Sequence, residues 1–245
     1  MAERLCIFCG KPANSREHLW SDWILKSLPT RRDITQKIGK GEVRKFAGPV
    51  TVRCVCTDCN NGWMSKLEES IRPVLSAMIH DLSPYLDLAE QARISGWAVK
   101  TAMVLEGTKP QKAARCYSFS DCEALRLKSS IPPHTRVWIG RFSESGLLGH
   151  GAQYVIEVGE RPVVSHGCVA TIIVGHVILQ ILSAYSPSEY SRQDLEVRCR
   201  LGPWNDSLIS IWPARGTILW PPSLSLTNDN GPLSYLRLRD RWKPE

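Results

Sequence analysis

Residues 56–63 read Cys56-Thr57-Asp58-Cys59-Asn60-Asn61-Gly62-Trp63, and they contain two cysteines in a C-x-x-C spacing. The same spacing occurs near the start of the chain, in Cys6-Ile7-Phe8-Cys9-Gly10. Two such turns are typical of one tetrahedral Zn²⁺ site, because each turn directs two sulfurs to a common point about 2.3 Å away. The sequence therefore predicts a structural zinc ion with four ligands, Cys6, Cys9, Cys56 and Cys59.

The length and composition limit the number of domains. With 245 residues and 43% apolar content, the chain can form one large domain, or a small metal-held module followed by a second domain with its own core. The early zinc motif favours the second arrangement, with a zinc module over residues 1–85 and a mixed α+β domain over residues 86–245. No apolar run approaches the roughly 18 residues of a membrane span, and the first turn begins too early for a secretory signal. A cytoplasmic location is expected.

The remaining cysteines also bear on the compartment. Nine cysteines in a cytoplasmic protein are expected to be metal ligands and buried thiols rather than disulfides, and their odd number agrees with that expectation. The sequence accordingly predicts buried thiols at the five that remain, Cys54, Cys116, Cys122, Cys168 and Cys199.

A basic segment lies between the two cysteine turns. The net charge of +7 and a pI near 9.0 favour a polyanionic partner weakly. The segment itself is strongly basic, so it is a candidate contact for a nucleic-acid backbone, although a solvated loop explains the same charges equally well. Its candidate nucleic-acid-binding residues are Arg31, Arg32, Lys37, Lys40, Arg44 and Lys45.

The expected elements of the first 80 residues alternate strands and helices. Apolar spacing predicts a short helix over residues 19–28, and glycines predict a hairpin or loop over residues 30–49. Residues 50–55 alternate at period two, which predicts a strand that leads into the second turn. A helix is expected behind that turn, capped by Asn60 or Asn61 and kinked or split by Pro73.

The motifs together resemble a known family. The order Cys6-x-x-Cys9, then Glu17-His18, then Cys56-x-x-Cys59-Asn60 is similar to that of HNH endonucleases of the ββα-metal type, which are built on a treble-clef zinc fold. The resemblance covers about residues 5–80.

The resemblance implies an activity and roles for particular residues. It implies a metal-dependent endonuclease that acts on nucleic acid, with double-stranded DNA expected as the partner. His18 would be the general base, since imidazole can accept a proton near neutral pH. Glu17 and Asn60 would hold a catalytic Mg²⁺ or Mn²⁺, with Asn61 as the reserve ligand, because these ions prefer oxygen donors.

The second part of the chain predicts architecture more than chemistry. Helices are expected over residues 88–106 and 119–126, the latter capped by Ser120, and strands over residues 136–142, 153–158, 169–174, 207–212 and 216–220. Residues 177–182 fit either a long bent strand or a helix. No phosphate loop or nucleophile elbow is present in the sequence. The alternative to the nuclease is a non-catalytic zinc module that binds nucleic acid or protein. The sequence also leaves open whether the chain forms a homodimer.

Overall fold

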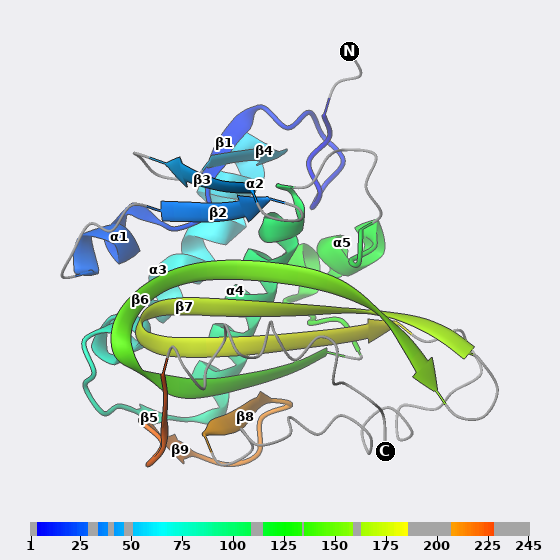
Figure 1. The fold of residues 1–245 in the computed structure, drawn as a ribbon. Helices are drawn as coiled ribbons and strands as arrows, with labels where there is room; N and C mark the ends of the chain where they lie inside the picture. Colours follow the sequence, from blue (N-terminus) through cyan, green and yellow to red (C-terminus); the bar gives the residue numbers. More distant parts are fainter. Residues whose placement is uncertain are drawn as a thin grey trace.

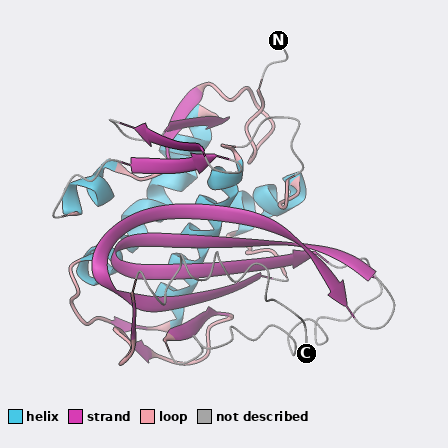
Figure 2. Cartoon of the chain, in the orientation of Figure 1, coloured by secondary structure: helices cyan, strands magenta, loops and turns pink. Residues whose placement is uncertain are grey.

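The computed structural model describes residues 4–28, 34–38, 42–46, 51–108, 115–133, 135–158, 163–185 and 207–227. Helices and sheets both contribute to it (Figures 1 and 2). This confirms the predicted α+β class. Among the described helices, none is long and apolar enough to cross a membrane.

Two small antiparallel sheets form the upper part of the molecule in Figure 1. Strand β1 (Ser15–His18) pairs with β4 (Thr51–Val55), and β2 (Ile34–Ile38) pairs with β3 (Glu42–Phe46). Helix α1 (Asp22–Ser27) lies between β1 and β2 in the chain. The predicted strand before the second cysteine turn, the hairpin and the short helix after His18 are thus all present.

One helical run follows the second cysteine turn. It comprises α2 (Thr57–Cys59), a wider π-helical turn η1 (Asn60–Met64) and α3 (Ser65–Ile79), and it bends at Gly62, whose φ and ψ are −94° and −106°. Of the two predicted effects of Pro73, a kink or a split, the split does not occur, because α3 continues through Pro73 to its end. Pro73 is exposed, so the carbonyl that it leaves without an amide partner can meet water.

Helix α4 (Leu88–Glu106) is the central element, and its predicted bounds are confirmed. Asp87 caps it in a reciprocal capping box with Glu90. All its residues from 94 to 104 are buried, because α3 packs on one side and strands β6, β7 and β8 pack on the other (Figure 1). A helix that is covered all round explains why its sequence is apolar on almost every face.

Helix α5 (Phe119–Lys128) begins at a different cap from the predicted one. The side chain of Ser118 accepts a hydrogen bond from the backbone N–H of Asp121, and Asp121 returns the contact to the N–H of Ser118. The prediction of Ser120 as the cap is therefore wrong. Both serines have an acidic residue three positions later, so the capping pattern alone does not separate them.

Two long strands, β6 (Thr135–Val158) and β7 (Val163–Tyr185), form a curved antiparallel hairpin beside α4 (Figure 1). They include all the strands predicted between residues 136 and 182, and they decide in favour of a strand over residues 177–182. The register shifts between Arg141 and Gly146. Gly175 faces that shift with a φ of +57°, and a Cβ atom there would lie 2.6 Å from the carbonyl oxygen of Ile79. Only glycine allows β7 to bend this closely around the end of α3.

The remaining strands are short and lie at the lower edge in Figure 1. Strand β8 (Leu208–Trp212) pairs antiparallel with β6, and β10 (Ser225–Leu226) pairs parallel with β6. Strand β5 (Tyr85–Leu86) pairs with β9 (Ile218–Leu219). The predicted strands over residues 207–212 and 216–220 are confirmed in part, since β9 is only two residues long.

The main hydrophobic core contains residues from both of the predicted units. Ile24 and Leu75 precede the predicted boundary at residue 85, and Trp97 and Ile139 follow it, yet all four belong to one cluster of buried side chains. A second, smaller cluster includes Trp138 from β6. The N-terminal part and the α4–β6–β7 part therefore share one apolar interior.

Candidate metal centre

Four cysteines converge at the N-terminal end of the molecule. The sulfur atoms of Cys6, Cys9, Cys56 and Cys59 all lie within 4.8 Å of one another, and those of Cys9 and Cys56 are 3.5 Å apart. Sulfurs that share a tetrahedral Zn²⁺ with bonds of about 2.3 Å are about 3.8 Å apart. The arrangement suits a metal ion such as zinc, with all four coordination positions filled by protein.

The first cysteine turn is a tight backbone loop. The N–H of Cys6 donates to the carbonyl of Lys11 (2.7 Å), and the N–H of Gly10 donates to the carbonyl of Cys6 (2.9 Å). Gly10 has a φ of +73°, a conformation that glycine adopts without strain. The N–H of Ile7 bonds the carbonyl of Cys54 on β4 (2.9 Å), so this loop is attached to the strand that leads into the second turn.

The second turn is also the start of the helix. Cys56 is the N-cap of α2, and its sulfur accepts a hydrogen bond from the N–H of Cys59 (3.4 Å). The prediction that Asn60 or Asn61 caps the helix is therefore wrong, because the helix begins at Thr57. A thiolate can replace the usual hydroxyl or carboxylate at an N-cap, since its charge favours the positive end of the helix dipole.

Polar side chains hold the two turns together outside the sulfur cluster. Lys11 forms an ion pair with Asp58 (2.8 Å). The side-chain oxygen of Asn14 accepts hydrogen bonds from the N–H and the hydroxyl of Thr57 (2.9 and 3.1 Å). These contacts join the second turn to the segment that follows the first.

Burial and hydrogen bonds shift the pKa of three of the thiols in different directions. Burial raises the pKa of Cys6 and of Cys59. Burial would also raise the pKa of Cys9, but hydrogen bonds from the Lys11 backbone and from the neighbouring thiols outweigh it, so that this pKa is lowered.

Glu17, a predicted ligand of the catalytic metal, points into the protein. Its side chain is 7% exposed, and one carboxylate oxygen lies 3.8 Å from the ammonium of Lys100 on α4. Burial raises the pKa of Glu17 to about 7; Lys100 lowers it and the nearby carboxylate of Glu68 raises it. The carboxylate is therefore desolvated and already faces a cation of the protein itself.

His18 and Asn60, the other predicted catalytic residues, do not join Glu17 in one pocket. His18 is exposed whereas Glu17 is buried, as expected for neighbours on opposite faces of a strand. The side-chain amide of Asn60 donates to the hydroxyl of Ser15 (2.8 Å) at the beginning of β1, and the reserve ligand Asn61 is exposed. A cation bound by Glu17 in this arrangement would lie on the other face of β1 from His18, so the residues present do not yet fit a shared catalytic metal.

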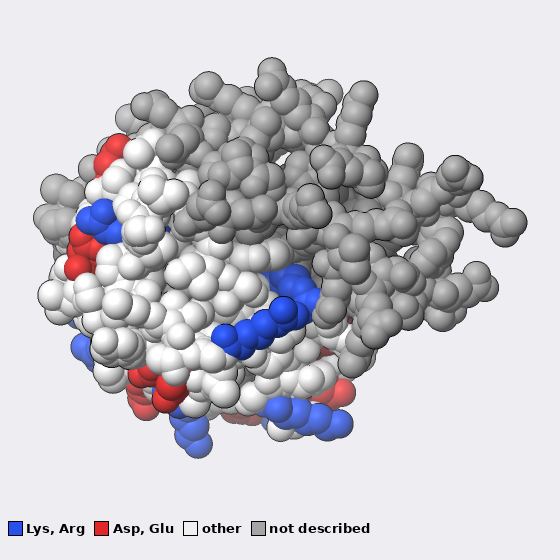
Figure 3. All heavy atoms as spheres, turned by 90° about the horizontal axis from the view of Figure 1, so that it is seen from below, with Lys and Arg blue, Asp and Glu red and all other residues white. Residues whose placement is uncertain are grey.

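The structure describes only the backbone of some of the candidate nucleic-acid-binding residues. Arg31, Arg32 and Lys40 lie outside the described residues. The backbones of Lys37 and of Arg44 and Lys45 belong to β2 and β3, but their side chains lie outside the description. Figure 3 views the molecule from below Figure 1, and the described charges of both signs on that face are scattered over a mainly uncharged surface.

The sequence interpretation missed an ion pair that lies beside Glu17. Lys100 and Glu68 form an ion pair at 2.9 Å, and Lys100 is 2% exposed. The sequence contains an indication of this pair, because Lys100 lies between Trp97-Ala98-Val99 and Thr101-Ala102-Met103. A lysine in such an apolar run is expected to be buried, and a buried lysine needs a carboxylate partner.

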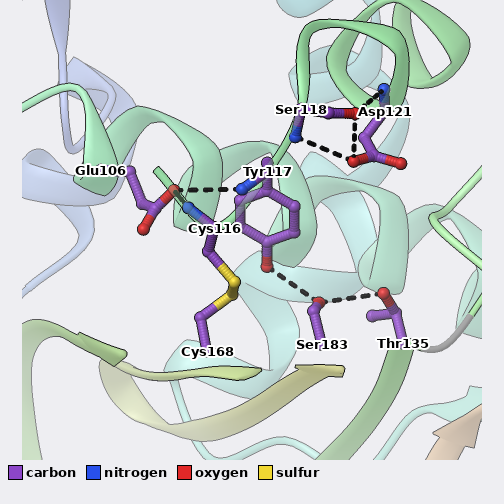
Figure 4. Close-up of a disulfide and its surroundings, with 8 residues drawn as sticks. All are labelled: Glu106, Cys116, Tyr117, Ser118, Asp121, Thr135, Cys168 and Ser183. Carbon is purple, nitrogen blue, oxygen red and sulfur yellow. Dashed lines mark hydrogen bonds between the residues drawn. A yellow bond between two sulfur atoms is a disulfide. The ribbon is translucent and has the colours of Figure 1, made fainter. Parts of the chain in front are cut away.

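A disulfide joins Cys116 to Cys168 (Figure 4). The prediction of buried free thiols at these two positions is wrong. It is confirmed for Cys54 and Cys122, and Cys199 lies outside the described residues. The two bonded cysteines are 52 residues apart, and no spacing motif indicates such a pair.

The surroundings of the disulfide are tightly hydrogen-bonded. A carboxylate oxygen of Glu106 accepts from the N–H groups of Cys116 (2.8 Å) and Tyr117 (3.3 Å). The hydroxyl of Tyr117 contacts that of Ser183 (3.1 Å), which in turn contacts that of Thr135 (2.9 Å). The segment before α5 is thereby fixed to α4, β6 and β7 (Figure 4).

Comparisons with protein-family models, with curated proteins and with solved structures found no match to this chain.

Proposed function

We propose that the N-terminal part of the chain is a treble-clef zinc module of the HNH type that hydrolyses phosphodiester bonds in DNA. The observation that carries the proposal is the convergence of the four cysteine sulfurs within 4.8 Å. Their two turns bring β1, which bears His18, beside β4 and the start of the α2–α3 run. This strand, strand and helix order is the one that the resemblance implies.

The chemistry rests on His18 as the general base. Its side chain is exposed at the end of β1, where a water molecule and a DNA backbone can both reach it. A neutral imidazole there would take the proton of the attacking water. The zinc ion would be structural, since four thiolates leave no position for water.

A second cation is part of the proposal. Mg²⁺ or Mn²⁺, when bound, would offset the negative charge that develops on the phosphate oxygens. The resemblance implies Glu17 and Asn60 as its ligands, but Glu17 in its inward position beside Lys100 does not fit that role. The basic segment with Arg31, Arg32, Lys37, Lys40, Arg44 and Lys45 would contact the DNA backbone.

The burial of Glu17 favours a second candidate function. With Glu17 beside Lys100, the module offers fewer groups for a catalytic metal than the resemblance implies, which suits a module that binds DNA or a protein without cutting it. Both candidates share the zinc site, so zinc content does not separate them.

Plasmid cleavage separates the two candidates. The zinc-loaded protein should nick supercoiled plasmid when Mg²⁺ or Mn²⁺ is added, and His18→Ala should abolish nicking while zinc content and DNA affinity stay nearly unchanged. His80→Ala is the matched control, because His80 is also exposed but lies at the far end of α3. Cleavage by His18→Ala at the parent rate would refute the catalytic role, and DNA binding without any cleavage would favour the second candidate.

A further inference from the structure

The segment from Glu17 to Ser21 holds His18 between two fixed ends. Within it, Leu19 and Trp20 are buried and His18 is exposed. Ser21 stands at the N-cap of α1, but its hydroxyl makes no capping bond to that helix. The polar groups at both ends of the segment are instead directed at other elements of the fold.

Both ends reach the same ion pair. At one end, the carboxylate of Glu17 lies 3.8 Å from the ammonium of Lys100. At the other end, the hydroxyl of Ser21 donates to one carboxylate oxygen of Glu68 at 2.5 Å. The second carboxylate oxygen of Glu68 accepts from Lys100 at 2.9 Å, so these four side chains form one continuous network.

The network is anchored in two helices. Lys100 comes from the fully covered stretch of α4, and Glu68 comes from the first turn of α3. Burial of the ammonium and of Glu17 strengthens their attraction, because little water remains to screen it. Any displacement of β1 or of the start of α1 would leave a buried charge without its partner, which is costly.

We propose that Lys100 and Glu68 are positioning residues, which fix the segment from Glu17 to Ser21 and thereby hold His18 at the surface in one orientation. This inference rests on the proposed function, since it assigns the pair to the support of the general base. It also gives Glu17 a role as an anchor of the segment rather than as a ligand. In this proposal, Lys100 and Glu68 do not touch the substrate.

Three variants test this proposal. Lys100→Met removes the charge at nearly constant length and separates the Glu17 end. Lys100→Met combined with Glu68→Gln also removes one of the two carboxylate charges that would otherwise lie unpaired, so it lessens the risk of simple unfolding. Ser21→Ala separates the other end alone. The matched control is Arg141→Met, which removes another ion pair between distant elements, that of Arg141 with Asp81.

The readouts are the kcat and KM of plasmid nicking, together with amide hydrogen exchange of residues 18–20, all measured well below the melting temperature. In Lys100→Met and in the double variant, kcat should fall about tenfold to a hundredfold, because small misplacements of a catalytic group have effects of that size. KM should stay within about twofold, and exchange of residues 18–20 should accelerate about tenfold or more. Ser21→Ala should show the same changes to a smaller extent, and Arg141→Met should show none of them.

A parent-like kcat and parent-like exchange in the Lys100 variants would overturn the proposal. If the parent does not nick DNA at all, the proposed function fails, and the exchange data still decide the structural part: unchanged exchange would refute the fixed segment. Equal effects of Arg141→Met and Lys100→Met would reduce the pair to general stabilisation and would overturn the positioning role.

Discussion

The molecule uses cysteine in two ways, in two regions. Each region brings together cysteines that are far apart in the chain, but different treatments would separate them. In the N-terminal region, four thiols converge on one point without bonding to each other, and Cys9 and Cys56 are 47 residues apart. Near α5, Cys116 and Cys168 form a disulfide across 52 residues. The two closed loops are of similar length, so the entropy that each link removes from the unfolded chain is similar. The first link would need a metal ion, however, whereas the second needs an oxidant.

The largest expected effect is loss of the metal link. Removal of the ion by a chelator, or Cys59→Ser, should unfold the first 80 residues, because structural zinc sites contribute about 10 kcal/mol or more to the folding of small modules. Metal analysis, circular dichroism and amide exchange would measure this. An unchanged melting curve after verified metal removal would show that the polar contacts of Lys11 and Asn14 hold the turns without an ion.

Loss of the disulfide should be the next largest effect. Cys116→Ser with Cys168→Ser should lower the free energy of unfolding by about 2–4 kcal/mol, and a phosphine reductant should have a similar effect on the parent only. Urea denaturation with and without reductant would measure both. The matched control is Cys122→Ala, which loses a buried free thiol but should keep the parent's response to reductant.

The disulfide also bears on the expected cytoplasmic location. Disulfides are rare in the cytosol, where thiols are kept reduced. Thiol labelling directly after lysis would tell whether Cys116 and Cys168 are bonded in the cell. Free thiols at both positions would mean that the link forms only under oxidising conditions.

The free energy of unfolding is expected to depend on pH because of Glu17. The pKa of Glu17 is raised to about 7, mainly by burial, against an ordinary value near 4.5. A carboxyl with a raised pKa stabilises the fold fully below its unfolded pKa and loses that contribution as the pH rises through the folded pKa. Glu17 should therefore cost about 3 kcal/mol of stability between pH 4.5 and pH 8.

Glu17→Gln isolates this contribution. The free energies of unfolding of parent and variant, each saturated with zinc, should diverge as the pH rises from 5 to 8, with the parent losing stability relative to the variant. Parallel pH profiles would mean that Lys100 keeps Glu17 ionised throughout, and that burial is not the dominant influence on its pKa.

The smallest expected effect concerns the helix beside the disulfide. Ser118→Ala should cost about 1 kcal/mol, because it removes the cap of α5. Ser120→Ala is the matched control and should cost clearly less, since Ser120 contacts only the Ser118 hydroxyl among the described bonds. Urea denaturation would measure both, and a larger effect at Ser120 would restore the cap that the sequence predicts.

Local signals made part of this fold predictable. The bounds of α4 follow from its apolar run, its capping box and the glycine after it, and the metal ligands follow from the C-x-x-C spacing. Such features depend on residues a few positions apart, so one sequence contains all the information needed for them.

The features that were missed depend on distant parts of the chain. The disulfide joins residues 52 positions apart, and the ion pair of Lys100 with Glu68 joins two helices that only the tertiary fold brings together. The inward position of Glu17 has the same origin, because strand alternation places it and His18 on opposite faces, and only packing against α4 decides which face is buried.

The contact of Lys100 with Glu17 and Glu68 also constrains how this chain can be divided in evolution or in the laboratory. A cassette of residues 1–85 transferred to another protein would carry two interior carboxylates but not the ammonium that neutralises them. The smallest portable unit should therefore extend at least through α4, so that recombination between genes would have to exchange that helix together with the cysteine turns.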